Sequence, residues 1–254
     1  MAAGKNDREN VMRARHAQLL NIGRSAGLAA AVLLLLTACG QGTKDGSSST
    51  SASSASGSSD SVLGKEDKVE QLPDMTLGDP NAPVKIIEYA SMTCPHCAHF
   101  DAEIFPLLKK AYIDTGKVFY TFREYPLDGV ALRASMVARC VDKDRFFGFL
   151  HGLFHTQLVW ANPDLWNDEN KTIEEKYTPL ATMAKEQAGM SREDFDKCVN
   201  DKTLENQIVA QEKRGTDEYH VSGTPSVFIN GETFKEIGSY EALDAKLKEI
   251  LAAK

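Results

Sequence analysis

Apolar and polar positions divide most of the chain into strand-like and helix-like stretches. The run from Val84 to Ala90 is largely apolar and predicts a buried strand. Apolar residues then recur at helical spacing as Phe100, Ile104, Leu107, Leu108 and Ala111. This helix contains Pro106, where we expect a bend because proline removes a backbone hydrogen bond. Lys117–Tyr125 is rich in β-branched and aromatic residues and predicts a second strand. A strand, a helix and a strand in this order predict a parallel β-α-β unit.

The second half of the chain begins with a long helical region. From Asp128 to about His220 the pattern is helical throughout. Pro225–Ile229 and Glu232–Lys235 are joined by Asn230-Gly231 and predict a β-hairpin, because Asn-Gly is the preferred two-residue turn. A closing helix is indicated by Leu243, Leu247, Ile250 and Leu251. The whole pattern predicts an α/β fold interrupted by a helical insert.

The first 38 residues have the pattern of an export signal. Arg13, Arg15 and Arg24 precede an apolar stretch, residues 26–38, which is too short to span a bilayer comfortably and suits a signal-peptide core. Its end, Leu36-Thr37-Ala38-Cys39, resembles a bacterial lipobox, in which the cysteine is lipidated and becomes the first mature residue. The alternative is an ordinary signal peptide with Cys39 nearby by chance. Met12 is a second candidate for the start of translation.

Composition separates a linker from the folded part of the chain. Residues 40–61 are dominated by Ser, Gly, Ala and Thr, which cannot bury a core, so we expect residues 39–71 to be a flexible tether or a simple spacer. Roughly 180 residues remain for one sizeable core. The net charge is −7, and the leader carries five basic and two acidic residues, so the remainder carries about −10. This charge argues against nucleic acid or an anionic bilayer surface as a partner.

The chemistry of the chain centres on Cys94-Pro95-His96-Cys97, at the junction of the first strand and its helix. Free backbone N–H groups and the helix dipole favour a thiolate at Cys94. Pro95, which fixes the first helical turn, and the side chain of His96, a potential donor and positive charge, favour a low thiol pKa there as well. The motif therefore indicates a redox-active dithiol. Half of a zinc site is one alternative, but Cys94, Cys97 and a nearby histidine would lack a fourth ligand, and we expect no metal. A structural disulfide is the other, although so short a loop gains little stability.

Glu88 lies within the first predicted strand, among apolar neighbours. Burying a carboxylate is costly unless it is protonated or paired, so burial is expected to raise its pKa. A carboxyl group of that kind suits a proton relay for Cys97, which loses a proton when it attacks a mixed disulfide. The alternative is a glutamate that faces solvent at a strand edge. Trp160 and Trp166 could line a peptide-binding groove, but aromatic residues are more often core anchors, and we leave them out of the predicted site.

From about Met75 to the C-terminus, the sequence resembles the thioredoxin-fold thiol:disulfide oxidoreductases of the DsbA type. The resemblance rests on Cys94–Cys97, on Glu88, on Val221–Gly231, which is similar to the cis-proline loop of that family, and on the pair Cys140 and Cys198. It implies a thioredoxin fold with an inserted helical domain. Residues 72–126 and 221–254 would form the thioredoxin-like part, and residues 127–220 the insert.

The resemblance also implies the remainder of the site. The Thr224-Pro225 bond would be cis and would face the dithiol, with the backbone of Thr224 offered to an extended substrate; a trans proline that begins an edge strand is the alternative. Threonine at this position also occurs in isomerases of the wider superfamily. Cys140 and Cys198 lie 58 residues apart in the insert, and we expect a structural disulfide between them. Two free buried cysteines or a redox-tuning pair remain as alternatives.

These observations predict an exported, lipid-anchored, monomeric disulfide oxidase that uses no cofactor. Its substrates would be reduced exported proteins, oxidised through a mixed disulfide at Cys94. A quinone-linked membrane partner similar to DsbB would reoxidise the dithiol, and the protein would be periplasmic or otherwise extracytoplasmic. A reductase or isomerase of exported disulfides is the nearest alternative. A chaperone-like binder of unfolded exported chains is an alternative from another class.

Overall fold

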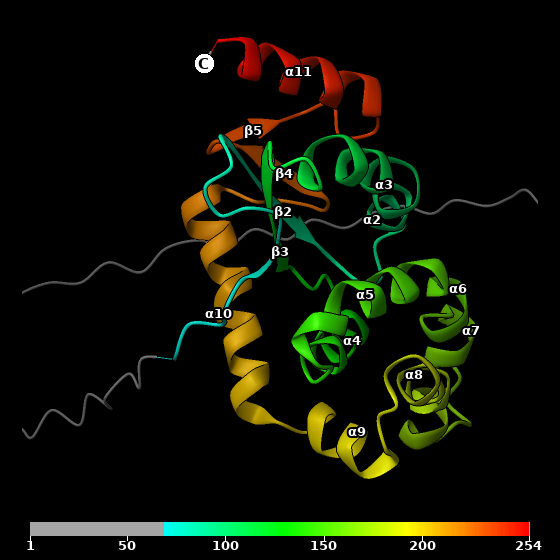
Figure 1. Ribbon diagram of the computed structural model, residues 1–254. Coiled ribbons are helices and arrows are strands. Elements are labelled where there is room, and N and C mark those ends of the chain that lie inside the picture. The colour runs from blue at the N-terminus through cyan, green and yellow to red at the C-terminus, as the bar shows by residue number, and fades with distance from the viewer. Residues whose placement is uncertain (1–68, 254) are drawn as a thin grey trace, which may run out of the picture. The chain divides into compact units, whose positions relative to one another are not determined.

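The computed structural model describes residues 69–253, so the predicted leader, the lipidation site at Cys39 and nearly all of the tether lie outside the described residues. A five-stranded sheet lies at the centre, in the order β1-β3-β2-β4-β5 (Figure 1). The strands are β1 (Met75–Leu77), β2 (Val84–Ala90), β3 (Val118–Glu124), β4 (Ser226–Ile229) and β5 (Glu232–Phe234). β2 and β3 are parallel, and the other three pairs are antiparallel. The predicted α/β class and the parallel β-α-β unit are confirmed.

The helical connection between β2 and β3 changes its hydrogen bonding along its length. It consists of α2 (Pro95–His99), the π-helical turn η1 (Phe100–Ile104), α3 (Phe105–Leu108) and the π-helical turn η2 (Lys109–Ile113). Pro106 has no N–H to donate. The backbone N–H of Phe105, the residue before it, donates a hydrogen bond to the carbonyl of Phe100, five residues earlier. The hydrogen bonding thus changes to a π-helical turn immediately before Pro106, where the sequence predicts a bend.

The insert between β3 and β4 is helical, as predicted. It contains α4 (Gly129–Arg139), the 3₁₀ turn η3 (Lys143–Arg145), α5 (Phe146–His155), α6 (Gln157–Trp160), α7 (Pro163–Trp166), α8 (Ile173–Ala188), α9 (Arg192–Val199) and α10 (Lys202–Tyr219). A disulfide joins Cys140, at the end of α4, to Cys198 of α9, with a Cα–Cα distance of 6.2 Å. Trp160 is buried, and its indole donates to the carbonyl of Leu153.

Helix α10 connects the insert back to the sheet (Figure 1). Near its end, Gly215 lies against the ring of Tyr89 on β2, so closely that a Cβ at this position would stand 2.8 Å from the ring. Glycine therefore permits the close approach of α10 to the sheet. The end of the helical insert, predicted at residue 220, falls at the end of α10. This helix belongs to the insert in sequence, but it also packs against the sheet.

The C-terminal elements follow the sequence prediction closely. Asn230 and Gly231 have φ values of 50° and 87°, which the two-residue turn between β4 and β5 requires. The side chain of Asn230 also accepts from the backbone N–H of Lys85, at 2.9 Å, so the turn is tied to the neighbouring strand. Helix α11 (Tyr240–Ala252) closes the chain and buries Leu243 and Leu247 against the core.

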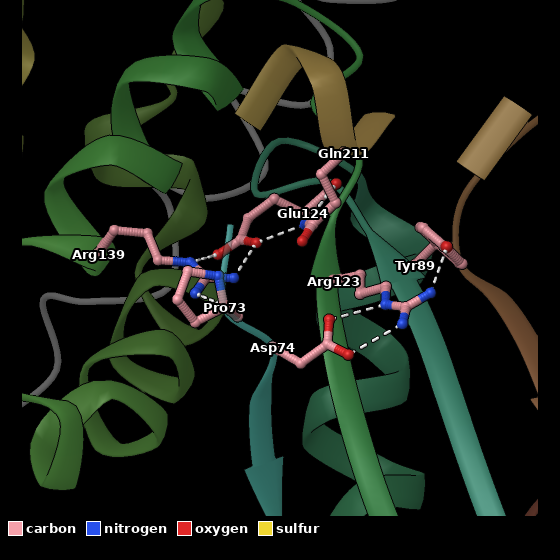
Figure 2. Close-up of polar contacts among 7 residues, drawn as sticks. All are labelled: Pro73, Asp74, Tyr89, Arg123, Glu124, Arg139 and Gln211. Carbon is pink, nitrogen blue, oxygen red and sulfur yellow. Dashed lines mark hydrogen bonds and ion pairs between the residues drawn. The ribbon is translucent and has the colours of Figure 1, made fainter. Parts of the chain in front are cut away.

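The short strand β1 was not predicted, and two arginines hold the segment that leads into it (Figure 2). Arg123 donates to both carboxylate oxygens of Asp74, at 2.8 and 2.9 Å, and to the hydroxyl of Tyr89. Arg139 donates to the carbonyl of Pro73. Three residues of strand are too few to show a periodicity, and side chains from elsewhere in the chain decide where this segment lies.

Arg139 also forms a buried ion pair with Glu124, the last residue of β3. Its guanidinium donates to both oxygens of that carboxylate at 2.5 Å, and the side chains are 6% and 0% exposed. The amide of Gln211 on α10 donates to the same carboxylate at 2.8 Å (Figure 2). Because both carboxylate oxygens are hydrogen-bonded to a guanidinium, the cost of burying this acid is offset. The network fixes the end of β3 beside the loop that leads to the dithiol.

Candidate active site

The dithiol occupies the first turn of α2. Cys94 is the N-cap residue, with extended backbone dihedrals, and Pro95 occupies the first turn, where its missing N–H leaves no bond unmade. Both thiols are free; Cys94 is 6% exposed and Cys97 is fully buried. The structure therefore presents the reduced form of the pair. The two sulfurs differ in their surroundings, although only one helical turn separates them.

The segment before β4 faces the dithiol from the other side. The Thr224-Pro225 bond is cis, as the resemblance implied. The Sγ of Cys94 donates to the carbonyl oxygen of Thr224 at 3.2 Å. The hydroxyl oxygen of Thr224 is also buried and has no hydrogen-bond partner in the described structure. An ionised Cys94 could no longer donate to the carbonyl, which would then be free to accept from another chain.

The surroundings of the two sulfurs push their pKa values apart. A hydrogen bond from the Cys97 thiol is the main cause that lowers the pKa of Cys94 to about 5. Burial opposes this effect, whereas the nearby Thr224 side chain and the backbone N–H groups of Cys97 and His96 lower the pKa further. Burial is the main cause that raises the pKa of Cys97 well above its ordinary value, and its bond to Cys94 and the charge of Glu88 add to this. Cys94 is thus the thiolate of the pair, and Cys97 remains protonated.

Glu88 is buried in β2, with 3% of its surface exposed. Burial raises its pKa to about 8, although the hydroxyl of Tyr120 on the neighbouring β3 donates to its carboxylate and opposes the rise. The charges of Asp101 and Cys94 raise the pKa further. The alternative of a solvent-facing glutamate is wrong. A carboxyl group with a pKa near 8 can both accept and donate a proton at neutral pH.

The side chain of His96 is placed differently from the sequence expectation. Its imidazole is exposed, and the contribution of this residue to the low pKa of Cys94 comes from its backbone N–H. Pro95 is exposed as well. The sequence argument identified the correct position but assigned the effect to the side chain, because the orientation of a short helix start is not visible in the sequence.

Two supporting residues were missed by the sequence analysis. Gln157 of α6 is buried, and its amide donates to the carbonyls of Met92 and Cys94, at 2.8 and 3.1 Å. Tyr120 holds Glu88, as described above. Both come from segments far from the motif, and neither residue type nor spacing marks them in the sequence. The insert therefore helps to hold the loop that carries the dithiol.

Between residues 69 and 253, no group of three or more His, Cys, Asp and Glu side chains is arranged to bind a metal ion. None of the helices in this range has both the length and the apolar character needed to cross a bilayer.

Comparison with known proteins identifies the class of this fold and site. A family model described as thioredoxin matches residues 70–249, so the chain belongs to the thioredoxin family. The predicted thioredoxin fold with a helical insert is therefore confirmed.

Within this family, the chain is similar to proteins named for disulfide chemistry. It is 35% identical over 179 residues to a Rickettsia bellii protein assigned by name as a protein-disulfide oxidoreductase, covering 69% of this chain and 65% of that protein. It is 26% identical to disulfide bond formation protein D of Bacillus subtilis, covering 70% and 77%. The chain spans between 55% and 65% of the length of the first three Rickettsia relatives. The crystal structure of alpha-DsbA1 from Wolbachia pipientis matches with a TM-score of 0.63 and 29% identity, over 72% of this chain and 93% of that one.

Proposed function

We propose that the protein is an exported thiol:disulfide oxidoreductase that donates the Cys94–Cys97 disulfide to reduced cysteine pairs of exported proteins. The difference between the two thiols supports this direction most strongly. A low pKa at Cys94 stabilises the thiolate of the reduced form, so the disulfide becomes a stronger oxidant. The relatives named protein-disulfide oxidoreductase and disulfide bond formation protein support the same class of reaction.

The reaction has two exchange steps. A substrate thiolate attacks Sγ of Cys94, a substrate–Cys94 disulfide forms, and the Cys94–Cys97 bond breaks. Cys97 leaves with the electron pair and takes a proton, which Glu88 can supply. A second substrate thiol then loses its proton and attacks the substrate sulfur, and Cys94 leaves as a thiolate. The substrate loses two electrons and the enzyme gains them.

Glu88 serves in both directions of the cycle. With a pKa near 8, it is mostly protonated at neutral pH and can protonate Cys97 as that sulfur leaves. During reoxidation, Cys97 attacks a mixed disulfide and must give up its proton, which the ionised fraction of Glu88 accepts. A membrane partner similar to DsbB would supply the oxidising equivalents. Thr224 and Pro225 would hold the extended substrate beside Cys94.

The location is part of the proposal. A lipid anchor at Cys39 and the tether up to residue 71 would hold a monomeric catalytic domain near a membrane, in the periplasm or another extracytoplasmic compartment. Labelling of the full chain with a radioactive fatty acid, with Cys39→Ser as the control, tests the anchor. Loss of label in the variant is expected, and equal labelling of both chains would contradict it.

The reduction potential of Cys94–Cys97 against glutathione decides the direction of the reaction. We expect a potential near or above about −200 mV, together with a Cys94 thiolate that titrates near pH 5. A potential near about −270 mV, as in thioredoxin, would indicate a reductase instead. Cys94→Ser separates the enzyme from a chaperone-like binder, because it abolishes oxidation of a reduced substrate but leaves pure binding unchanged.

A further inference from the structure

The helical insert places an imidazole–carboxylate pair beside the dithiol helix, and the mechanism above does not use it. Nδ1 of His151, on α5, lies 2.5 Å from Oδ1 of Asp101, on η1. The two side chains are 37% and 14% exposed. Both line a cavity of about 790 Å³ whose other walls include Ala98, Ala102 and Phe154. The pair therefore stands where solvent meets the interior next to the active-site helix.

A cluster of rings connects this pair to the buried acid. The ring of Phe105 lies 5.0 Å from the ring of Tyr120 and 5.0 Å from the imidazole of His151. Phe147, one helical turn before His151 on α5, lies 6.2 Å from the Tyr120 ring. The hydroxyl of Tyr120 donates to Glu88. Helix α5 thus fixes the imidazole within two ring contacts of the residue that holds Glu88.

Charge links the same groups. Burial is the main cause of the raised pKa of Glu88, and the carboxylate of Asp101 raises it further. Asp101 also raises the pKa of Tyr120, after burial and the effects of Glu88 itself. The other titratable groups that act on Glu88 are Cys94 and Tyr120.

The cavity offers few other charges to compensate Asp101. Its remaining titratable residues are Lys109 and His155. Lys109 is paired with Asp114 at 2.6 Å, and the side chain of His155 makes no hydrogen bond among residues 69–253. His151 is therefore the group best placed to offset the charge of Asp101.

We propose that His151 is a positioning residue for proton transfer at Cys97, because its pairing with Asp101 sets how much negative charge faces Glu88. A protonated imidazole offsets the carboxylate, so Glu88 releases its proton more readily. Without the imidazole, Asp101 faces Glu88 uncompensated, and Glu88 holds its proton more tightly. The helical insert would thereby control the proton step of the dithiol. This inference rests on the proposed function.

The test follows the carboxyl resonance of Glu88 against pH in the reduced protein with labelled glutamate. His151→Asn is expected to move the Glu88 midpoint upward, and Asp101→Asn is expected to move it downward. The double variant should titrate close to Asp101→Asn, because removing the carboxylate removes the charge that the imidazole offsets. The matched control His155→Asn changes a histidine of the same cavity that has no carboxylate partner, and it should leave the midpoint unchanged.

A second measurement keeps the structural and chemical effects apart. The pH profile of Cys97 attack on a model mixed disulfide at Cys94 should move upward with the Glu88 midpoint in His151→Asn. If the wild type is active and His151→Asn has the same Glu88 midpoint and the same pH profile as the wild type, this inference is overturned and the proposed function is not. A wild type without thiol–disulfide exchange would overturn both the inference and the proposed function. If His151→Asn does not fold, His151→Gln takes its place, and an unchanged Glu88 midpoint and pH profile in that variant would overturn the inference.

Discussion

Replacing Glu88 by glutamine should stabilise the protein at neutral pH while slowing its reaction. The pKa of this carboxyl rises from an ordinary 4.5 to about 8 on folding. The folded protein therefore holds the proton at pH values where the unfolded chain releases it, and the unfolded state gains stability from the ionised carboxylate. The contribution of Glu88 to the free energy of unfolding is therefore fully present below pH 4.5 and is lost as the pH rises towards 8.

The magnitude follows from the same two values. At pH 7, which lies about 2.5 units above the unfolded pKa and still below the folded one, the loss is about 3 kcal/mol at roughly 1.4 kcal/mol per unit. An amide at position 88 cannot ionise, so the variant escapes this loss. Its carbonyl oxygen can still accept from the hydroxyl of Tyr120. The rate of proton transfer at Cys97 is expected to fall by roughly 10²-fold or more in this variant.

The assay is urea denaturation of the reduced protein near pH 4.5 and near pH 7, with the Cys140–Cys198 disulfide intact. At each pH, the unfolding free energy of wild type is subtracted from that of Glu88→Gln. The two differences are then compared between the two pH values. Any pH-independent effect of the amide cancels in this comparison, and about 3 kcal/mol in favour of the variant is expected. A difference that stays constant between the two pH values would refute the assignment of Glu88 as a buried acid with a raised pKa.

Glu124→Gln is the matched control, because Glu124 is equally buried but is paired with Arg139. Removing its charge leaves the guanidinium unpaired inside the protein. The variant should lose roughly 3–5 kcal/mol, the range found when one partner of a buried pair is removed. The same substitution at two buried positions is therefore expected to have effects of opposite sign at pH 7.

Three further predictions concern the contacts around the dithiol and in the insert. Cys97→Ala should raise the pKa of Cys94, because the Cys97 thiol provides the main hydrogen bond to that sulfur; ultraviolet thiolate absorbance against pH measures this, and an unchanged midpoint would contradict it. Replacing both Cys140 and Cys198 by serine should cost about 4 kcal/mol of unfolding free energy, from the loop of 58 residues that their disulfide closes, and no change in the denaturation midpoint would contradict the expected contribution. Gln157→Leu should cost about 1–3 kcal/mol, because it removes the donor to two carbonyls of the loop that carries the dithiol; amide hydrogen exchange at residues 94–98 should accelerate, and an equal rate would show that other contacts hold the loop.

Local patterns were sufficient for much of the fold and for the centre of the site. The strand with Glu88, the cysteine motif at a helix start and the Asn230-Gly231 turn each depend on neighbouring residues, and the structure has all three as expected. The cis bond at Pro225 came from resemblance to a family, and the physics of the local sequence alone favours trans.

What the sequence did not show depends on contacts between distant segments. Gln157 and His151 reach the dithiol region through the packing of the insert, and Tyr120 reaches Glu88 through the pairing of β3 with β2; none belongs to a local motif. Strand β1 is fixed by arginines that lie about 50 and 65 residues further along the chain. At Pro106 the sequence predicts a bend, and the structure has a π-helical turn immediately before it; π-helical bonding depends on how the helix packs, which the sequence does not show.

Two buried glutamates near the ends of adjacent strands have different surroundings, one suited to a structural role and the other to proton transfer. Glu88 on β2 and Glu124 on β3 are both buried, and they lie two positions apart in the parallel register, opposite Phe122 and Ala90. Glu124 accepts hydrogen bonds from the guanidinium of Arg139 and the amide of Gln211, so this acid ties together the sheet, α4 and α10. In the described part of the chain, the Glu88 side chain accepts a hydrogen bond from the Tyr120 hydroxyl alone; burial, together with the charge of Asp101, raises its pKa to about 8. Between residues 69 and 253, no cation forms an ion pair with Glu88. Its raised pKa reduces stability at neutral pH, and the same raised pKa would let Glu88 pass a proton to or from Cys97 in the proposed mechanism.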